Sequence, residues 1–372
     1  GAPGPRPIHC SPPSHGGQAA RRVAAMASGS LSFFQGGEWM NFPRDHLPRK
    51  PKIKVTLATP ELVKFTVTDT DVSVVNALRR IILAEIPTLA IEIVNIDDNE
   101  TSLFDEFIAH RMGLLPLVSH AAGDIPPDGG FVEYKDCTCF DGCPYCTVEF
   151  KVDLFNEEDK VMSVTHFDME KTDKYPRPDL SDHDQVRAAP FRNPELDFAT
   201  DSRENGILIA KMKKDNHLRM TCQARKGIAK YHSKWMPVAT SLYNYQPRID
   251  LNREMIDSLT LDEKIDFVQA CPRKVFNLDI EDKVQIERLQ DCIFCDECVT
   301  KGRVFGKKDM VKVRMDSNMV HFTVEGVTPD GPRSMIDVVR ASIRILDYKM
   351  SLFLKDAYGD KIMEWLPRQS KS

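Results

Sequence analysis

The sequence contains no long apolar run, and neither sign of charge dominates it. A helix that spans a membrane needs about 20 consecutive apolar residues, and no stretch approaches that length. The 50 Lys and Arg residues nearly balance the 55 Asp and Glu residues, which leaves a formal net charge of −5. A protein that coats nucleic acid needs a strong basic excess. We therefore expect no membrane contact, and contact with nucleic acid only indirectly, through partners.

The sequence also lacks the motifs of the common catalytic classes. Glu106 and His110 stand four residues apart, but the second histidine that a zinc protease needs is missing. Residues 302–308, GRVFGKK, lack the spacing and the Ser or Thr of a phosphate-binding loop. No dinucleotide motif occurs, and no nucleophile has a plausible base. These motifs therefore provide no candidate catalytic residues.

Cysteine is present in two short groups. Eight of the ten cysteines have the spacing of metal ligands, and Cys10 and Cys222 stand alone. Such grouping is typical of metal sites in a reducing compartment rather than of a disulfide framework.

The first 51 residues have no apolar periodicity and are rich in Gly, Pro, Ser, Ala and Arg. We expect residues 1–51 to be a disordered extension. No acidic residue precedes Glu38, so an organellar transit peptide is one interpretation. The favoured interpretation is that Met26, which opens MASGS, is the true start and that the first 25 residues are a translated leader.

Residues 70–87 have the periodicity of one amphipathic helix. Its apolar side chains recur at steps of three and four residues: Val75, Leu78, Ile82 and Ile86. Pro87 is expected to end the helix. Arg79 and Arg80 fall between the apolar positions, so at least one guanidinium must leave the core and can reach a partner. A strand is predicted at residues 89–96, followed by a helix that carries Glu106 and His110.

Two stretches resemble the signature of the RNA polymerase assembly subunits. They are NALRRIILAEIPTLAIE at residues 76–92 and DEFIAHRMGLLPL at residues 105–117. This family includes bacterial alpha, its archaeal counterpart and the third-largest subunit of eukaryotic RNA polymerase II. The resemblance implies a non-catalytic scaffold of a DNA-directed RNA polymerase, most of all RNA polymerase II, in the nucleus. It also implies two kinds of partner, a small alpha-like subunit that forms a heterodimer and the large catalytic subunits.

A basic region further along the chain extends the resemblance. Residues 203–235 carry nine Lys or Arg against two acidic residues, and solvated strands explain part of this excess. Within the region, ARKGIAKYHSKWMPV at residues 224–238 matches the family's pattern. The resemblance implies a surface that docks a large catalytic subunit. We assign four residues to this surface: Arg79, Arg80, Lys226 and Trp235.

The order of the predicted elements indicates a discontinuous α+β architecture. Strands and a helix at residues 52–88 and again at residues 309–372 each lack a complete core, so we expect them to form one dimerisation domain together. Residues 89–248 are predicted to be a β-rich insert domain, and residues 249–308 an inserted module in which Thr260 and Glu263 form a helix capping box. This arrangement resembles the alpha-subunit plan of the family.

The last predicted helix carries a heptad-like seam. Its apolar side chains alternate at steps of three and four residues: Ile336, Val339, Ile343, Leu346, Met350 and Phe353. Two heptads do not distinguish an interface between chains from a stripe that faces the chain's own core. The resemblance favours a seam shared with the small alpha-like subunit.

The first cysteine group predicts a zinc site. CTCFDGCPYC supplies four thiols within ten residues: Cys137, Cys139, Cys143 and Cys146. Four thiolates so close can bind one zinc tetrahedrally, and Gly142 and Pro144 allow tight turns. The site would be closed and structural. The CxCxxxCxxC spacing resembles that of the polymerase II member of the family and separates the chain from the related subunit of polymerases I and III.

The second group predicts an iron–sulfur cluster. CIFCDEC places Cys292, Cys295 and Cys298 at the intervals that bind three irons of a cubane, and Cys271, followed by Pro272, is the candidate fourth ligand. No second triplet occurs, so we expect one 4Fe–4S cluster, with a 3Fe–4S form or zinc as alternatives. The module resembles the ferredoxin-like insertion of some archaeal members of the family. Because it has few large apolar residues, we expect it to depend on the cluster for folding.

A second function class is kept open on the basis of this module. An iron–sulfur redox or electron-transfer protein would use the cluster as its working group. A single predicted cluster, a closed zinc site and the lack of a flavin or dinucleotide motif favour the scaffold instead.

Overall fold

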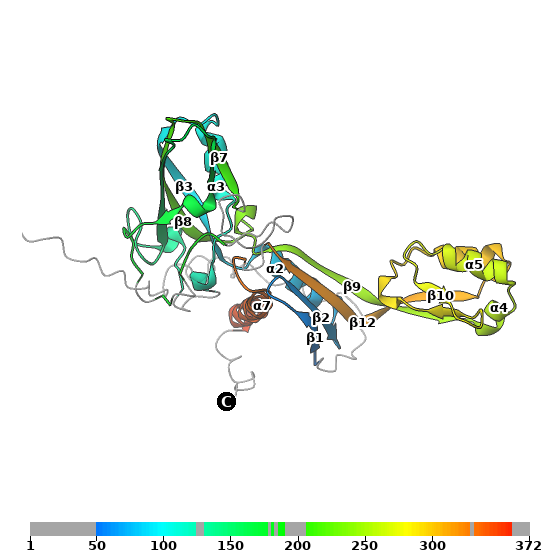
Figure 1. Ribbon diagram of the computed structural model, residues 1–372. Helices are drawn as coiled ribbons and strands as arrows, with labels where there is room; N and C mark the ends of the chain where they lie inside the picture. Colours follow the sequence, from blue (N-terminus) through cyan, green and yellow to red (C-terminus); the bar gives the residue numbers. More distant parts are fainter. Residues whose placement is uncertain are drawn as a thin grey trace, which may run out of the picture.

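A computed structural model of the chain describes residues 50–123, 130–177, 180–181, 185–189, 206–327 and 331–358. The predicted extension at residues 1–51 lies outside this part except for its last two residues. Three bodies follow one another in space, as Figure 1 shows: an insert domain, a sheet covered by two helices, and a module at the end of two long strands. Among the described helices, none has both the length and the apolar character needed to cross a bilayer.

The central sheet is assembled from distant parts of the chain. Its antiparallel order is β1–β2–β12–β9, with β1 at Lys52–Ala58, β2 at Leu62–Thr68, β9 at Val238–Leu251 and β12 at Val311–Gly326. Helices α2 (Val72–Ala84) and α7 (Met335–Tyr358) pack together on one face of it. Phe65 and Phe322 stack in the core with ring centroids 4.8 Å apart. The two ends of the chain therefore share one core.

Helix α2 forms as its sequence predicts. The Asp71 side chain caps it by accepting a hydrogen bond from the Ser73 backbone N–H at 2.8 Å. The helix ends at Ala84, shortly before Pro87, where a ring in place of the N–H would break the hydrogen-bond ladder. Its buried side chains form one stripe: Val75, Leu78, Ile81 and Ile82.

Strand β9 departs from the predicted arrangement. Its sequence lies almost wholly within residues 89–248, which we expected to belong to the insert domain, but it pairs with β12 in the central sheet from Val311↔Leu251 to Gly326↔Val238. The expected boundary at residue 248 falls inside one continuous strand. Alternating side chains on this strand do not reveal which of two sheets it joins, because its partner β12 lies about 70 residues further along the chain.

The insert domain is β-rich. It contains β3 (Thr88–Asn99), α3 (Asp105–Gly113), β4 (Thr147–Phe155), β5 (Met162–Thr165), β6 (Glu170–Lys171), β7 (Leu208–Met212) and β8 (His217–Gly227). The strands form one sheet in the order β3–β8–β4–β6 and a smaller pair, β5–β7. Ile108 and Met112 of α3 pack against this sheet in a core of its own.

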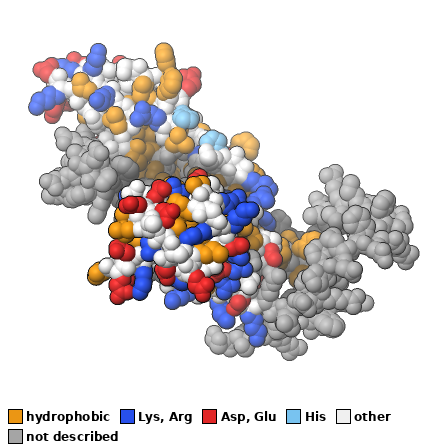
Figure 2. Space-filling view, turned by 90° about the vertical axis from the view of Figure 1, so that its right-hand side faces the viewer, with side chains coloured by type: hydrophobic (Ala, Val, Ile, Leu, Met, Phe, Trp, Pro, Cys, Tyr) orange, Lys and Arg blue, Asp and Glu red, His pale blue; other side chains and the backbone are white. Residues whose placement is uncertain are grey.

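The module at the far end of β9 and β12 has a compact set of short elements. They are α4 (Arg253–Asp257), α5 (Leu261–Gln269), the hairpin β10 (Phe276–Leu278) with β11 (Val284–Ile286), and α6 (Glu297–Val304). The capping box of Thr260 and Glu263 is present at α5, as predicted. Figure 2 looks onto the outer end, where acidic, basic and apolar side chains are interspersed.

The module has more of an apolar core than its sequence suggested. Phe267 and Phe276 are buried with ring centroids 5.0 Å apart, and Ile256, Val284 and Met310 are fully covered around them. The expectation that too few large apolar residues are present is therefore wrong, because most of these buried side chains come from residues 249–308 themselves, and Met310, Val311 and Val313 add to them.

Candidate metal centres and subunit interfaces

The first cysteine group converges on one point. The Sγ atoms of Cys137, Cys139, Cys143 and Cys146 all lie within 4.8 Å of one another. The closest pair, Cys139 and Cys146, is separated by 3.4 Å. Zinc–sulfur bonds of about 2.3 Å place the thiolates of a tetrahedral site about 3.8 Å apart. The four-cysteine cluster thus has the size and the donor set for zinc.

The backbone around these thiols is held from outside the cysteine stretch. Tyr134 donates a hydrogen bond from its hydroxyl to the Phe140 carbonyl at 3.0 Å, and Tyr175 donates to the Asp141 carbonyl at 2.8 Å. Gly142 adopts a φ of 102°, and a Cβ there would lie 3.2 Å from the Tyr175 ring. Both left-handed geometry and close approach therefore favour glycine at this turn.

Burial of the Cys143 thiol disfavours the loss of its proton. Burial raises the pKa of the Cys143 thiol, and the adjacent Cys137 and Cys146 raise it further. A bound Zn²⁺ would offset this cost, since zinc ligands bind as thiolates. Zinc at these four residues would act structurally, by closing the loop that leads from residue 137 directly into β4.

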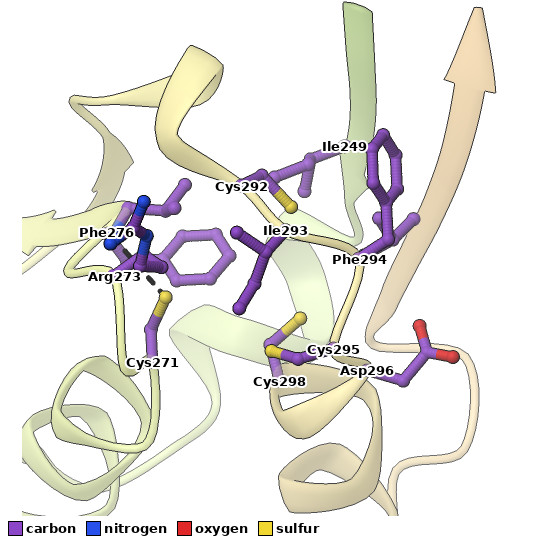
Figure 3. A pocket seen from close by; sticks show the side chains of 12 residues that line it. Ile249, Cys271, Arg273, Phe276, Cys292, Ile293, Phe294, Cys295, Asp296 and Cys298 are labelled. Atoms are coloured by element: carbon purple, nitrogen blue, oxygen red, sulfur yellow. Dashed lines mark hydrogen bonds between the residues drawn. The ribbon is translucent and has the colours of Figure 1, made fainter. Parts of the chain in front are cut away.

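The second cysteine group lines a hollow at the base of the module. Cys271 approaches from the end of α5, and Cys292, Cys295 and Cys298 lie on the loop before α6 and on its first turn (Figure 3). Ile249 from β9 and Val313 from β12 complete the wall. The enclosed space in this hollow is small, about 20 Å³.

These four thiols are close neighbours but are not gathered around a single point. Burial raises the pKa of Cys298 to about 11, and Cys292, Cys295 and Cys271 contribute to the increase. In the part of the chain that the structure describes, the zinc-sized group at residues 137–146 is the only set of three or more ligands close enough to hold one ion. Each thiolate of a cubane binds a different iron, so wider spacing suits a cluster better than zinc.

The loop that carries the triplet is held in an uncommon conformation. Phe294 and Asp296 have φ values of 55° and 58°, in the left-handed region that non-glycine residues rarely adopt. Such residues cost about 1–3 kcal/mol each and concentrate at ligand sites. The two turns wrap residues 292–298 around the hollow and orient their sulfur atoms toward it.

Helix α7 presents two different apolar faces. Met335, Val338, Ala341 and Ile345 are buried against the central sheet and α2. The predicted seam lies on another side: Ile336 and Ile343 are 40% and 41% exposed, and Met350 and Phe353 are 51% and 66% exposed. Val339 and Leu346 are partly buried at the border between the faces. The sequence pattern indicated the exposed apolar face but not the buried stripe, because both repeat at three- and four-residue steps.

The predicted docking residues do not share one environment. Arg80 is exposed on α2, whereas Arg79 is half-buried and donates to the Asn76 side chain at 3.0 and 3.1 Å. Lys226 is half-buried on β8 and has interactions within the chain. Of this set, Arg80 is the most accessible to a partner.

Trp235 is a core residue and not a surface anchor. It is 6% exposed, its ring packs on Gly227, and its Nε1 donates to the Arg225 carbonyl at 3.1 Å. Its carbonyl accepts a hydrogen bond from the Thr88 hydroxyl at 2.7 Å. The assignment of Trp235 to a docking surface is therefore corrected: an aromatic residue in a basic stretch resembles an interface residue, but here it joins β3 to β8.

We expect Trp235→Ala to lower the free energy of unfolding by about 3–5 kcal/mol, because it leaves a cavity between the strands. Urea unfolding of the purified chain measures this loss. Tyr231→Ala is the matched control, since Tyr231 is 59% exposed and lies in the same loop. An equal, small effect of both substitutions would contradict the assignment of Trp235 to the core.

The residues that support the four-cysteine loop were not found from sequence. Tyr175 lies 29 residues beyond Cys146, and Arg177, 5% exposed, stacks on Phe131 and Tyr145 at 5.0 and 4.9 Å. Sequence spacing contains no signal for contacts of this range.

The sequence is similar to RNA polymerase subunits across most of its length. The family described as the RNA polymerase Rpb3/Rpb11 dimerisation domain matches residues 64–350. DNA-directed RNA polymerase II subunit rpb3 of Dictyostelium discoideum is 32% identical over 308 residues, which are 82% of this chain and 94% of that protein. Subunit 3 of RNA polymerases II, IV and V of Arabidopsis thaliana is 34% identical, over 74% of this chain and 83% of that protein.

An archaeal relative shows the same relationship. DNA-directed RNA polymerase subunit Rpo3 of Methanosphaera stadtmanae is 28% identical over 298 residues, which cover 80% of this chain and 95% of that protein. None of these relatives bears the name of a redox protein, so the electron-transfer alternative gains no support from them. The mixed sheets and helices and the matched dimerisation domain agree with the resemblance seen in the sequence. The chain belongs to the Rpb3/alpha-like family and is a non-catalytic assembly subunit of RNA polymerase.

Proposed function

We propose that this chain is the scaffold of RNA polymerase II around which other subunits assemble in the nucleus. Its relatives are named as subunits of RNA polymerase II, which supports membership of that complex and, because of it, the nuclear location. The observation that carries the proposal is the exposed seam of α7, which leaves large apolar side chains uncovered on a domain of the matched dimerisation family. Contact with nucleic acid comes through the assembled complex.

The partner on the seam is a small alpha-like subunit. Helix α7 carries an exposed apolar strip formed by Ile336, Ile343 and Phe353. Its other face already packs against the chain's own core. A partner helix with a matching strip would bury both, and apolar burial contributes roughly 25 cal/mol for each Å². The discontinuous dimerisation domain, the insert domain with its zinc loop and the ferredoxin-like module together form the plan of the proposed scaffold.

The two cysteine groups hold different metals in this proposal. Cys137, Cys139, Cys143 and Cys146 bind one structural zinc. Cys271, Cys292, Cys295 and Cys298 bind one 4Fe–4S cluster, which is supported by their spacing in the sequence, by their position around one hollow and by the left-handed turns at Phe294 and Asp296. A 3Fe–4S form or zinc remains the alternative for the second group.

Docking of the large catalytic subunits is the part of the proposal that charge reversal tests. Arg80→Glu, alone and with Arg79→Glu, should preserve the heterodimer and reduce recovery of the large subunits about tenfold or more, because Arg residues commonly anchor interfaces. Purification through this chain followed by mass spectrometry measures the recovery.

Lys211→Glu is the matched control for that experiment, since Lys211 is exposed on β7 of the insert domain and its reversal changes the charge equally. Normal recovery of both large subunits with the doubly reversed chain would contradict the docking role of α2. If no polymerase subunit copurifies with the unaltered chain, the proposed scaffold function itself is contradicted.

A further inference from the structure

The tip of the zinc loop carries an aromatic side chain that no described residue covers. Phe140, between Cys139 and Cys143, is 98% exposed. Single exposed apolar residues are ordinary on protein surfaces, so exposure alone identifies no site. Phe140 differs from them because its backbone is fixed on both sides.

Several contacts hold the tip in one conformation. The carbonyls of Phe140 and Asp141 each accept a hydrogen bond from a tyrosine hydroxyl, those of Tyr134 and Tyr175. Gly142, at a φ of 102°, makes the turn directly after them. The thiols on either side of the tip belong to the four-cysteine cluster. An aromatic side chain presented on a fixed backbone loses little entropy when it binds, since only its two side-chain torsions remain free.

Outside the ion pairs that the chain forms, the exposed charges beside Phe140 are acidic. Residues 131–149 contain four acidic side chains and one basic one. That cation, Lys135, forms an ion pair with Glu133 at 2.6 Å. Three cations from elsewhere in the chain also contact this stretch: Lys174 pairs with Glu149 at 3.0 Å, and Arg177 and Arg225 are buried under its tyrosine rings. Asp136 and Asp141 are exposed near the tip. Zinc held by four thiolates would add negative charge, because four thiolates outweigh one divalent cation. A partner surface must therefore combine an apolar pocket with positive charge.

We propose that Phe140 inserts into an apolar pocket bordered by Lys or Arg on a polymerase subunit other than the small alpha-like partner. The seam for that partner is on α7 of the central sheet, whereas Phe140 precedes β4 in the insert domain, which has a separate core. The inference rests on the proposed function, because it needs an assembled polymerase, and it adds a contact distinct from α2 and α7.

The first test follows oxidation of Phe140 itself. Hydroxyl-radical footprinting with mass spectrometry is applied to the heterodimer and to polymerase purified through this chain. Phe140 should oxidise readily in the heterodimer and about tenfold more slowly in the polymerase. Equal rates in both would overturn the inference while leaving the proposed function standing, and a failure to recover polymerase would overturn both.

The second test identifies the contact. Phe140→p-benzoylphenylalanine, introduced into the full chain, should crosslink on irradiation to a polymerase subunit at a site with Lys or Arg nearby. Crosslinking only to the small alpha-like partner, or to no subunit, would overturn the inference.

Substitution shows whether the contact contributes to binding. Phe140→Ala should weaken retention of the crosslinked subunit in salt washes about tenfold, as loss of an aromatic anchor does, whereas Phe140→Tyr should retain it. Zinc content and heterodimer yield should be unchanged in both variants, which separates loss of the contact from loss of the loop. Retention equal to that of the unaltered chain with Phe140→Ala would count against the contact.

Discussion

Ile343→Asp should abolish the heterodimer while leaving the chain folded. Ile343 is 41% exposed on the seam of α7, so an aspartate there costs the free chain little. In the heterodimer it would place an unpaired carboxylate in an apolar interface, which costs several kcal/mol. We expect the dissociation constant to rise at least about a hundredfold, measured by sedimentation or titration calorimetry with the small alpha-like subunit.

Two matched substitutions on the same helix separate the seam from the core. Ser351→Asp adds the same charge at an exposed position off the seam and should leave the dissociation constant unchanged. Ile345→Ala removes a side chain that is 7% exposed in the chain's own core and should lower stability by about 2–5 kcal/mol with or without the partner. Native affinity of the Ile343→Asp chain would show that the seam is not the interface.

Anaerobically purified protein should contain about four irons and about one zinc per chain, with the broad thiolate-to-iron absorption of a cubane. Cys271→Ser should weaken the cluster or leave a three-iron form, because the remaining triplet holds three corners. Metal analysis and absorption spectra measure both changes. Two zincs and no iron under strict anaerobiosis would remove the iron–sulfur assignment.

Cys222→Ser is the control for these measurements, since Cys222 is fully buried on β8 and far from either cysteine group in the sequence. Its metal content should equal that of the unaltered chain. Because Phe267 and Phe276 give the module an apolar core, loss of the cluster should loosen residues 292–298 first and not unfold every element of the module. Hydrogen exchange of the Cys271→Ser chain would show which residues of the module lose protection.

Local features of the fold were predictable because their causes are local. The Asp71 cap, the stripe of α2 and the capping box of Thr260 each depend on residues within one or two turns. The convergence of the first four thiols followed from their spacing within ten residues. In each case the residues that form the sequence pattern are also the residues that make the contacts.

The failures share a different cause, which is contact between distant segments. Strand β9 joins the central sheet because of its pairing with β12, and Trp235 is buried because Gly227 and Thr88 lie against it. On α7, the period of the helix shows that apolar faces exist but not which face the sheet takes. Burial of Val338 and exposure of Ile343 are decided by the position of the sheet.

The placement of β2 beside β12 affects how the chain is made. Thr66 and His321, hydrogen-bonded neighbours in the sheet, are 255 residues apart in the sequence. The insert domain has all its described strands between residues 88 and 227 and can fold while the ribosome is still translating the rest. The core on the apolar face of α2 includes side chains of β2 and β9, but it is completed only by β12 and α7. A nascent chain stopped before residue 311 would lack the β12 and α7 side chains and would leave part of that face uncovered, as a surface that a chaperone could bind.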